Sequence, residues 1–184
     1  IRVDCINPER LKELIDIHNS KRKPKIHIPK TNSERIADII GYSCYFGSIL
    51  FLIFIWGDLP DKVPAHYNAI GEVDRWGSKM ELLVLPIIGA FLALFMQLFE
   101  KFPETHNYPE RLNEENAKEF YLLSRKMMNH LKAICLIILS LLLIESVSIA
   151  LQWRDGFGAW LLPILIISAL IPVIVGIIKQ RKIK

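Results

Sequence analysis

Four long apolar runs, almost free of charged residues, constrain this chain of 184 residues more than any other feature of its sequence. Each run has about 18–23 residues, which at a rise of about 1.5 Å per residue is enough to cross a hydrocarbon core about 30 Å thick. Lipid offers no partner to an exposed backbone, and the alternation typical of barrel strands is absent. The sequence therefore predicts an all-α, polytopic membrane bundle of four transmembrane helices. The predicted spans are residues 36–56, 82–99, 131–153 and 159–178.

The distribution of basic residues predicts the orientation of this bundle. Of the 23 lysines and arginines, nineteen lie in residues 1–35, in the connection at residues 100–132 or after the fourth span. Loops rich in Lys and Arg stay in the cytoplasm, so both termini are expected there. The four tryptophans lie near the opposite boundary, as an aromatic belt would. The net charge of +4 is thus explained by orientation, and no nucleic-acid partner is expected.

Residues 1–35 differ in kind from the rest of the chain and are expected to form a cytoplasmic juxtamembrane segment. Residues 1–5 alternate like the end of a strand, and Leu11, Leu14 and Ile15 share one face of a predicted helix. Two interpretations stay open: the last unit of a soluble domain that begins before this sequence, or an amphipathic helix on the inner leaflet. The basic run 21–25 is expected to be a solvated tether.

The connection at residues 59–79, on the outer side, is denser in residues with special geometry than a simple linker requires. Pro60 and Pro64 fix φ, and Gly71 permits a turn with positive φ. Several polar side chains between them can bond one another or a ligand. We therefore predict an ordered outer loop whose recognition or architectural residues are Pro60, Pro64, His66, Asn68, Gly71, Asp74 and Lys79.

His66 and Asp74 are weak candidates for a metal site, because both side chains are suitable zinc ligands. A zinc site needs three or four ligands, however, and this loop contains a single histidine. The favoured interpretation is that His66 and Asn68 cross-link the loop, with Asp74 paired to Lys79 or Arg75. No metal and no cofactor are expected.

Glu145 lies in the middle of the third predicted span, next to Ser146 and Ser148. A carboxylate at membrane depth is costly unless it finds partners. The favoured hypothesis is an interhelical hydrogen bond to a Ser, a Tyr or Gln97; the alternative is a proton-relay or transport site. Asp38 is expected at the inner edge of the first span. One continuous helix is predicted over residues 112–153, with its N-cap near Asn113.

Two motifs carry a resemblance to a known family. Residues 60–79 have the pattern Pro-x-x-Val-Pro-x-His-Tyr-Asn-x-x-Gly-x-x-Asp-Arg-x-Gly-Ser-Lys. A second stretch lies between spans two and three and contains Asn107, Tyr108, Pro109, Asn116 and Arg125. From residue 36 to the third span, the chain resembles a membrane domain of unknown function that Firmicutes proteins share with the sporulation-delaying-toxin immunity proteins. The resemblance implies a bacterial plasma membrane, an immunity or signalling role and sequestration of a cytoplasmic regulator.

The sequence has no nucleophile elbow, no phosphate loop and no carboxylates paired at one membrane depth, so the protein is not expected to be an enzyme. The leading hypothesis is a receptor-like or regulatory membrane protein. Its 59–79 loop would bind an extracytoplasmic ligand or protein, and its 100–131 helix or N-terminal region would bind a cytoplasmic partner. The alternative is a non-catalytic subunit of a larger membrane complex. A third is a small transporter or metal-dependent membrane enzyme that uses His66, Asp74 and Glu145. The oligomeric state stays open.

Overall fold

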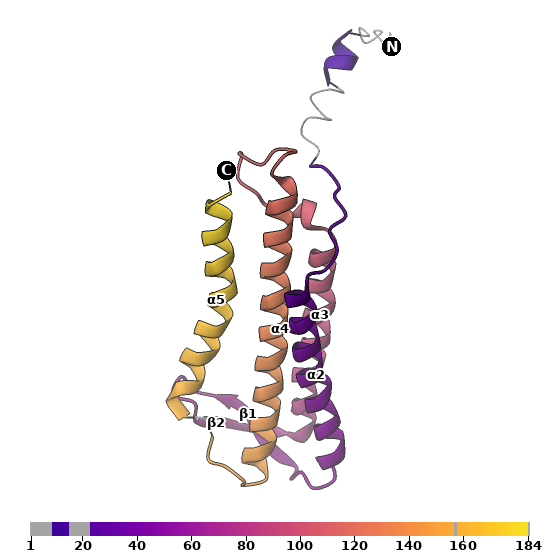
Figure 1. Cartoon of the computed structure of the whole chain (residues 1–184). Helices are drawn as coiled ribbons and strands as arrows, with labels where there is room; N and C mark the ends of the chain where they lie inside the picture. Colours follow the sequence, from indigo (N-terminus) through magenta and orange to yellow (C-terminus); the bar gives the residue numbers. More distant parts are fainter. Residues whose placement is uncertain (1–8, 15–22, 157, 184) are drawn as a thin grey trace, which may run out of the picture.

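The computed structural model describes residues 9–14, 23–156 and 158–183, so the expected strand at residues 1–5 lies outside the described part. Residues 9–14 are helical, and Leu11 and Leu14 are both exposed. Four long helices follow, and each is long and apolar enough to cross a membrane, which confirms the predicted four-span bundle (Figure 1). They are α2 (Asn32–Ile55), α3 (Val84–Lys101), α4 (Ala117–Ala150) and α5 (Leu161–Arg181).

Helix α4 is the centre of the bundle. It packs against α2, α3 and α5, whereas α2 and α3 touch each other little and α5 packs mainly on α4. Successive helices run in opposite directions, so the start of α2 and the end of α5 lie at one end, here called the terminal end (Figure 1). The other end, called the hairpin end, carries the connection between α2 and α3. The predicted tryptophan belt lies there, at Trp56, Trp76, Trp153 and Trp160.

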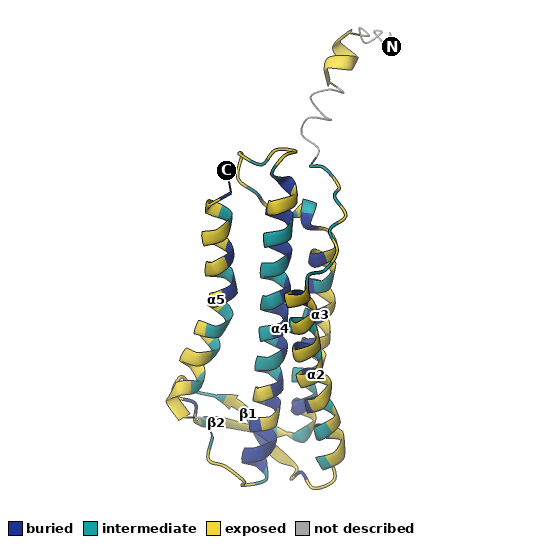
Figure 2. Ribbon diagram, viewed as in Figure 1, coloured by how far each residue is buried: buried dark blue, intermediate teal, exposed yellow. Residues whose placement is uncertain are grey.

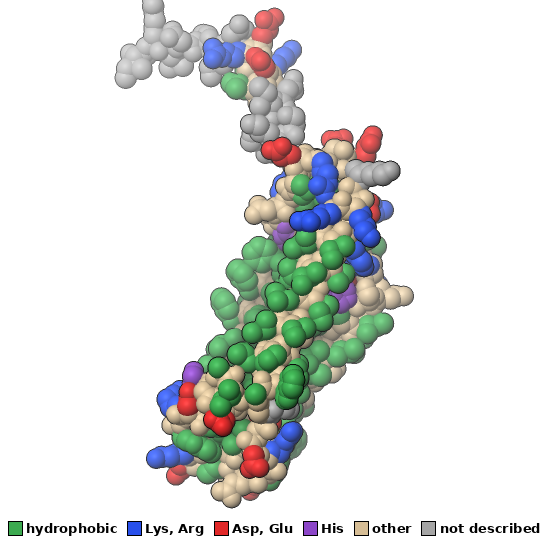
Figure 3. All heavy atoms as spheres, turned by 90° about the vertical axis from the view of Figure 1, so that its left-hand side faces the viewer, with side chains coloured by type: hydrophobic (Ala, Val, Ile, Leu, Met, Phe, Trp, Pro, Cys, Tyr) green, Lys and Arg blue, Asp and Glu red, His purple; other side chains and the backbone are tan. Residues whose placement is uncertain are grey.

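The middle of the bundle has an apolar surface, and its buried residues lie where the helices face one another. Figure 2 shows buried residues along the sides of α2, α3 and α4 that face one another, and Figure 3 shows apolar side chains covering the middle of the molecule between two charged ends. Small residues allow this close packing: a Cβ on Gly41 of α2 would lie 2.9 Å from the Ala133 Cα of α4. At the hairpin end, Leu52, Leu143 and Val147 belong to one buried apolar cluster.

The connection between α2 and α3 is ordered, as predicted, but it contains a β-hairpin that the sequence did not predict. Strands β1 (Lys62–Tyr67) and β2 (Val73–Ser78) pair antiparallel, with irregular register on both sides of His66. Val63 in β1 is fully buried in the apolar cluster of the hairpin end. A 3-10 turn, η1 (Lys79–Leu83), then leads into α3. The hairpin is therefore part of the bundle's packing.

The predicted helix over residues 112–153 is too long at both ends. The Asn113 side chain accepts backbone N–H groups two and three residues later, and this turn delays the start of α4 to Ala117. At the far end Gln152 has a φ of 59°, and the Trp153 N–H donates to the Ser148 carbonyl. This left-handed cap ends α4 at Ala150.

Candidate functional site

The tip of the β-hairpin is held by a compact set of hydrogen bonds centred on Asn68. Its side-chain oxygen accepts the N–H groups of Ile70 and Glu72, at 3.1 and 2.9 Å, and its carbonyl accepts the N–H of Gly71. Gly71 has a φ of 78°, which favours glycine. A Cβ there would lie 2.3 Å from the carbonyl oxygen of Gly158, so the tip rests against the start of the α5 region. Asn68 and Gly71 therefore shape the loop.

His66 and Asp74 form a pair on the exposed side of the hairpin. The His66 Nδ1 lies 2.6 Å from the Asp74 Oδ1, and the two side chains are 63% and 43% exposed. The predicted pairing of Asp74 with Lys79 or Arg75 is wrong, because the bulged register brings His66 beside it. Within the described residues no group of three His, Cys, Asp or Glu side chains is placed to hold a metal ion. A metal at His66 would need ligands from elsewhere.

A second exposed pair joins the hairpin to η1, the turn before α3. Arg75 donates two hydrogen bonds to the carboxylate of Glu81, at 2.9 and 3.3 Å, and this pairing raises the pKa of Arg75. Gly77 makes the contact possible, since a Cβ there would lie 2.1 Å from the Glu81 carboxylate. His66, Arg75 and Glu81 line a hollow of about 360 Å³ between the hairpin, α3 and α4. Polar groups from three elements thus meet at one opening.

The hollow reaches α4 through Tyr67. The Tyr67 hydroxyl lies 2.9 Å from the Ser146 Oγ, and burial raises the pKa of Tyr67. Among the remaining predicted loop residues, Pro64 is buried and lines the same hollow, and Pro60 is exposed. The Lys79 ammonium lies 5.5 Å from the centre of the Trp56 ring, outside the hollow.

Glu145 does not lie in the middle of a span, as the sequence suggested, but five residues before the end of α4. Its side chain is almost fully buried, and its carboxylate lies 3.9 Å from the Arg154 guanidinium, beyond the end of the helix. Gln97, a predicted partner, instead accepts a hydrogen bond from Lys132 at the other end of the bundle. The cause of the error is the early end of α4 at Ala150, which places Glu145 at the hairpin end.

The second sequence motif folds at the terminal end, around Tyr108. The Tyr108 hydroxyl donates to the Pro103 carbonyl at 2.8 Å, its ring packs against Phe120 and Tyr121, and burial raises its pKa to about 12. Asn107 and Pro109 are exposed.

Asn116 holds the turn before α4. Its side-chain oxygen accepts the Asn113 N–H, and its side-chain nitrogen donates to the Arg111 carbonyl, both at the terminal end of the bundle. Of the five predicted residues in this motif, Tyr108 is partly buried against Phe120 and Tyr121, and Arg125 is buried.

Arg125 ties α4 to α2 and to the segment that precedes it. It donates to both carboxylate oxygens of Glu34, at 2.7 and 3.0 Å, and neither side chain is more than 7% exposed. It also donates to the carbonyls of Ile28 and Pro29. The Glu34 carboxylate in turn accepts the Thr31 N–H, which completes a capping box at the start of α2.

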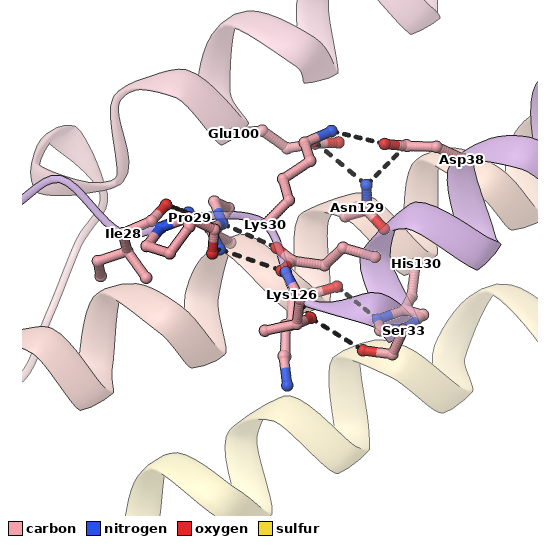
Figure 4. A network of polar contacts seen from close by, with 12 residues as sticks. Ile28, Pro29, Lys30, Ser33, Asp38, Glu100, Lys126, Asn129 and His130 are labelled. Atoms are coloured by element: carbon pink, nitrogen blue, oxygen red, sulfur yellow. Dashed lines mark hydrogen bonds and ion pairs between the residues drawn. The ribbon is translucent and has the colours of Figure 1, made fainter.

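Two helical turns further along α4, a fully buried lysine joins three helices. The Lys132 ammonium lies 2.6 Å from Glu100 of α3 and 2.9 Å from Asp38 of α2. Lys30 pairs with the same two carboxylates, at 3.1 and 2.6 Å, and Asn129 donates to both (Figure 4). These contacts outweigh the effect of burial and raise the pKa of Lys30. We call this set, together with Arg125 and Glu34, the charge network.

The charge network balances three acids against three bases, and sequence reasoning missed most of it. The sequence predicts Asp38 at the membrane edge and places Glu100 and Lys132 among the charges of the connection between the second and third spans. A signal was present: Arg125, Asn129 and Lys132 are spaced by four and three residues, which places them on one face of α4. This polar face continues directly into the apolar face that packs on α2.

Comparisons with known proteins place the hairpin at the centre of the recognisable part of the chain. A family described as a domain of unknown function (DUF1648) matches residues 45–90, from the middle of α2 through the hairpin into α3. An uncharacterized protein of Archaeoglobus fulgidus is 35% identical over 66 residues, which is 35% of this chain and 36% of that protein. The match therefore spans about a third of the length of this relative. No solved structure matches the chain.

The chain is thus a membrane protein that contains a segment similar to a domain of unknown function. Both matches are to proteins without an assigned activity, so the resemblance to toxin-immunity proteins stays a prediction.

Proposed function

We propose that the protein is a receptor-like regulatory membrane module, of the signalling or immunity type, which binds a ligand or protein at the hairpin end. The observation that supports this is the hollow beside the hairpin. The Arg75–Glu81 ion pair and His66, which contacts Asp74, line this hollow from three elements, and none of them belongs to the buried apolar cluster of the hairpin end. The hairpin end carries four of the 23 basic residues, which supports an extracytoplasmic position.

Helix α4 is the element that would carry a signal between the two ends. It contacts the hairpin through Ser146 and the charge network through Arg125 and Lys132. A helix is stiff, so a ligand that displaces Tyr67 would act on one end of α4, and the residues of the charge network lie towards the other end of the same helix. The network joins α4 to α2 and α3 by ion pairs with a defined geometry. In the proposed mechanism, ligand binding changes the equilibrium between two packings of these helices.

A photocrosslinking experiment tests the recognition step. Para-benzoylphenylalanine is placed at Trp76, which is 50% exposed on β2, and the full chain is irradiated in membranes of its own host. We expect a discrete crosslinked species. It should fall at least fivefold in the double variant Arg75→Gln/Glu81→Gln, which removes one base and one acid from the hollow.

The matched control is Asp58→Asn/Lys62→Gln, which removes the same charges from exposed positions of the hairpin end outside the hollow. The control should keep the crosslinked species. The same yield in all three proteins, or no discrete species in any, would contradict recognition at the hollow. The identity of the species also separates a receptor from the alternative function, a subunit of a larger membrane complex, because a stoichiometric membrane partner is expected only for the subunit.

The charge network favours one other candidate function, a small transporter, because buried charges near membrane depth often mark ion pathways. Between Lys132 and Glu145, however, the buried residues of α4 include no charged side chain. Flux of protons or metal ions into proteoliposomes that contain the purified protein would support this candidate. It should then be lost on Lys132→Met.

A further inference from the structure

A groove of about 310 Å³ lies between α4 and α5 near the terminal end. Seven of its ten lining residues are apolar, and the other three are the basic residues Lys126, His130 and Lys179. No acidic residue lines it. This composition combines an apolar wall with an electropositive mouth, and its volume lies within the range of ligand pockets.

Among the described residues, the basic side chains of the groove take part in no ion pair. The ion pairs of the charge network leave out both Lys126 and Lys179. Figure 4 shows the Lys126 side chain extending away from that network towards α5. The His130 Nδ1 lies 2.7 Å from the Lys126 carbonyl, which can only accept, so Nδ1 carries the proton and Nε2 is left for the groove. Three positive or protonatable groups therefore face one opening without a counter-charge.

The mouth of the groove lies at the expected depth of lipid headgroups. His130 precedes the end of α4 at Ala150 by twenty residues, about 30 Å of helix, which is the thickness of a hydrocarbon core. Lys179 lies in the last turn of α5. The apolar wall continues from these residues towards the middle of the bilayer through Ile134 and Ile171.

The floor of the groove is set by a close contact between the two helices. A Cβ on Gly176 of α5 would lie 2.7 Å from the Met127 sulfur of α4, so glycine lets the helices approach there. Because α5 packs mainly on α4, the sides of the groove are open to the surrounding lipid. A ligand can therefore enter from the bilayer.

We propose that this groove binds an anionic phospholipid, with its phosphate among Lys126, His130 and Lys179 and an acyl chain along Ile134 and Ile171. The lack of acidic residues in the lining favours an anion over a cation or a zwitterion, and each basic side chain near an anionic headgroup contributes about 1 kcal/mol. The apolar wall favours a lipid over free phosphate, which would leave that wall without a partner. The site lies at the opposite end from the hairpin and does not depend on recognition there.

Lipid binding can be measured on the purified full chain by native mass spectrometry in mild detergent, with titration of phosphatidylglycerol, phosphatidylcholine or inorganic phosphate. We expect phosphatidylglycerol to bind at least tenfold more tightly than phosphatidylcholine. The variant Lys126→Gln/Lys179→Gln should weaken phosphatidylglycerol binding about 30-fold, as expected for the loss of two such charges. The matched control is Lys118→Gln/Lys182→Gln, which removes two exposed charges from the same end outside the groove and should change binding less than threefold.

Equal weakening in both double variants would overturn the site, since binding would then follow overall charge. Equal affinity for the two phospholipids would also overturn it. A further outcome is that inorganic phosphate displaces phosphatidylglycerol at the same concentration at which the lipid binds. This result would show a site for an oxyanion alone and would overturn the assignment to a lipid. A folding defect is recognised by circular dichroism. In that case the single variant Lys179→Gln, on the exposed end of α5, replaces the pair, with an expected loss of about fivefold.

Discussion

The buried ammonium of Lys132 provides the sharpest test of what holds the terminal end together. Lys132→Met keeps the length of the side chain and removes its charge from a site with no solvent exposure. Asp38 and Glu100 would then share a single ammonium, that of Lys30, which is 31% exposed. Removing one partner of a buried ion pair costs about 3–5 kcal/mol. Because Lys30 continues to compensate in part, we expect a loss of about 3 kcal/mol.

The free energy of unfolding can be measured by titration with sodium dodecyl sulfate in mixed micelles, followed by circular dichroism. Lys118→Met is the control, because Lys118 is exposed on the same helix and should cost less than about 0.5 kcal/mol. The double variant Lys132→Met/Glu100→Gln removes one charge of each sign, so it should be more stable than Lys132→Met alone. A cost below about 1 kcal/mol for Lys132→Met, or no recovery in the double variant, would refute the claim that these groups act as one network.

Three further predictions concern the packing of the hairpin, the packing of the helices and the response to pH. Gly71→Ala should release the hairpin tip and increase its cleavage by protease several-fold, because of its positive φ and the nearby carbonyl, whereas Gly57→Ala, with open space around it, should not. Gly41→Ala should lower the unfolding free energy by about 1–3 kcal/mol, because it pushes α2 against the backbone of α4, and Gly47→Ala should leave it unchanged within about 0.5 kcal/mol. Burial lowers the pKa of His106 below its ordinary value of 6.5, so the native state favours the neutral ring. The stability that this preference provides is complete above pH 6.5 and is lost as the pH falls through the lower native pKa. His106→Gln should therefore flatten the decrease in stability between pH 7 and pH 5, and an unchanged pH profile would contradict this.

The membrane fold could be predicted from the sequence because lipid leaves few options to four apolar runs. The ends of the helices were less predictable. Helix α2 begins at Asn32, before the apolar run, because the capping box of Thr31 and Glu34 stabilises its polar first turn. Helix α4 ends three residues early because Gln152 adopts a left-handed conformation, which hydropathy does not encode.

The candidate sites were predicted unevenly, for a related reason. The density of prolines, glycines and polar residues marks the 59–79 loop, but its strands lack clear alternation, and their pairing is irregular at His66. The charge network was hidden because Glu34, Asp38 and Glu100 lie near helix ends, where a charge normally reaches water, and because Lys132 lies at the edge of the predicted third span. Only the close packing of α2, α3 and α4 turns Lys132 and Glu100 inward.

The contact between Gly71 and Gly158 also sets an order of events during synthesis. The two residues are about 90 positions apart, and at about 5–20 residues per second the ribosome needs about 4–18 s to pass from one to the other. During this interval the hairpin tip has been made, but the surface on which it rests has not. The final docking of the hairpin is therefore coupled to the insertion of α5, and a chain that stops before α5 leaves the hairpin tip without this contact.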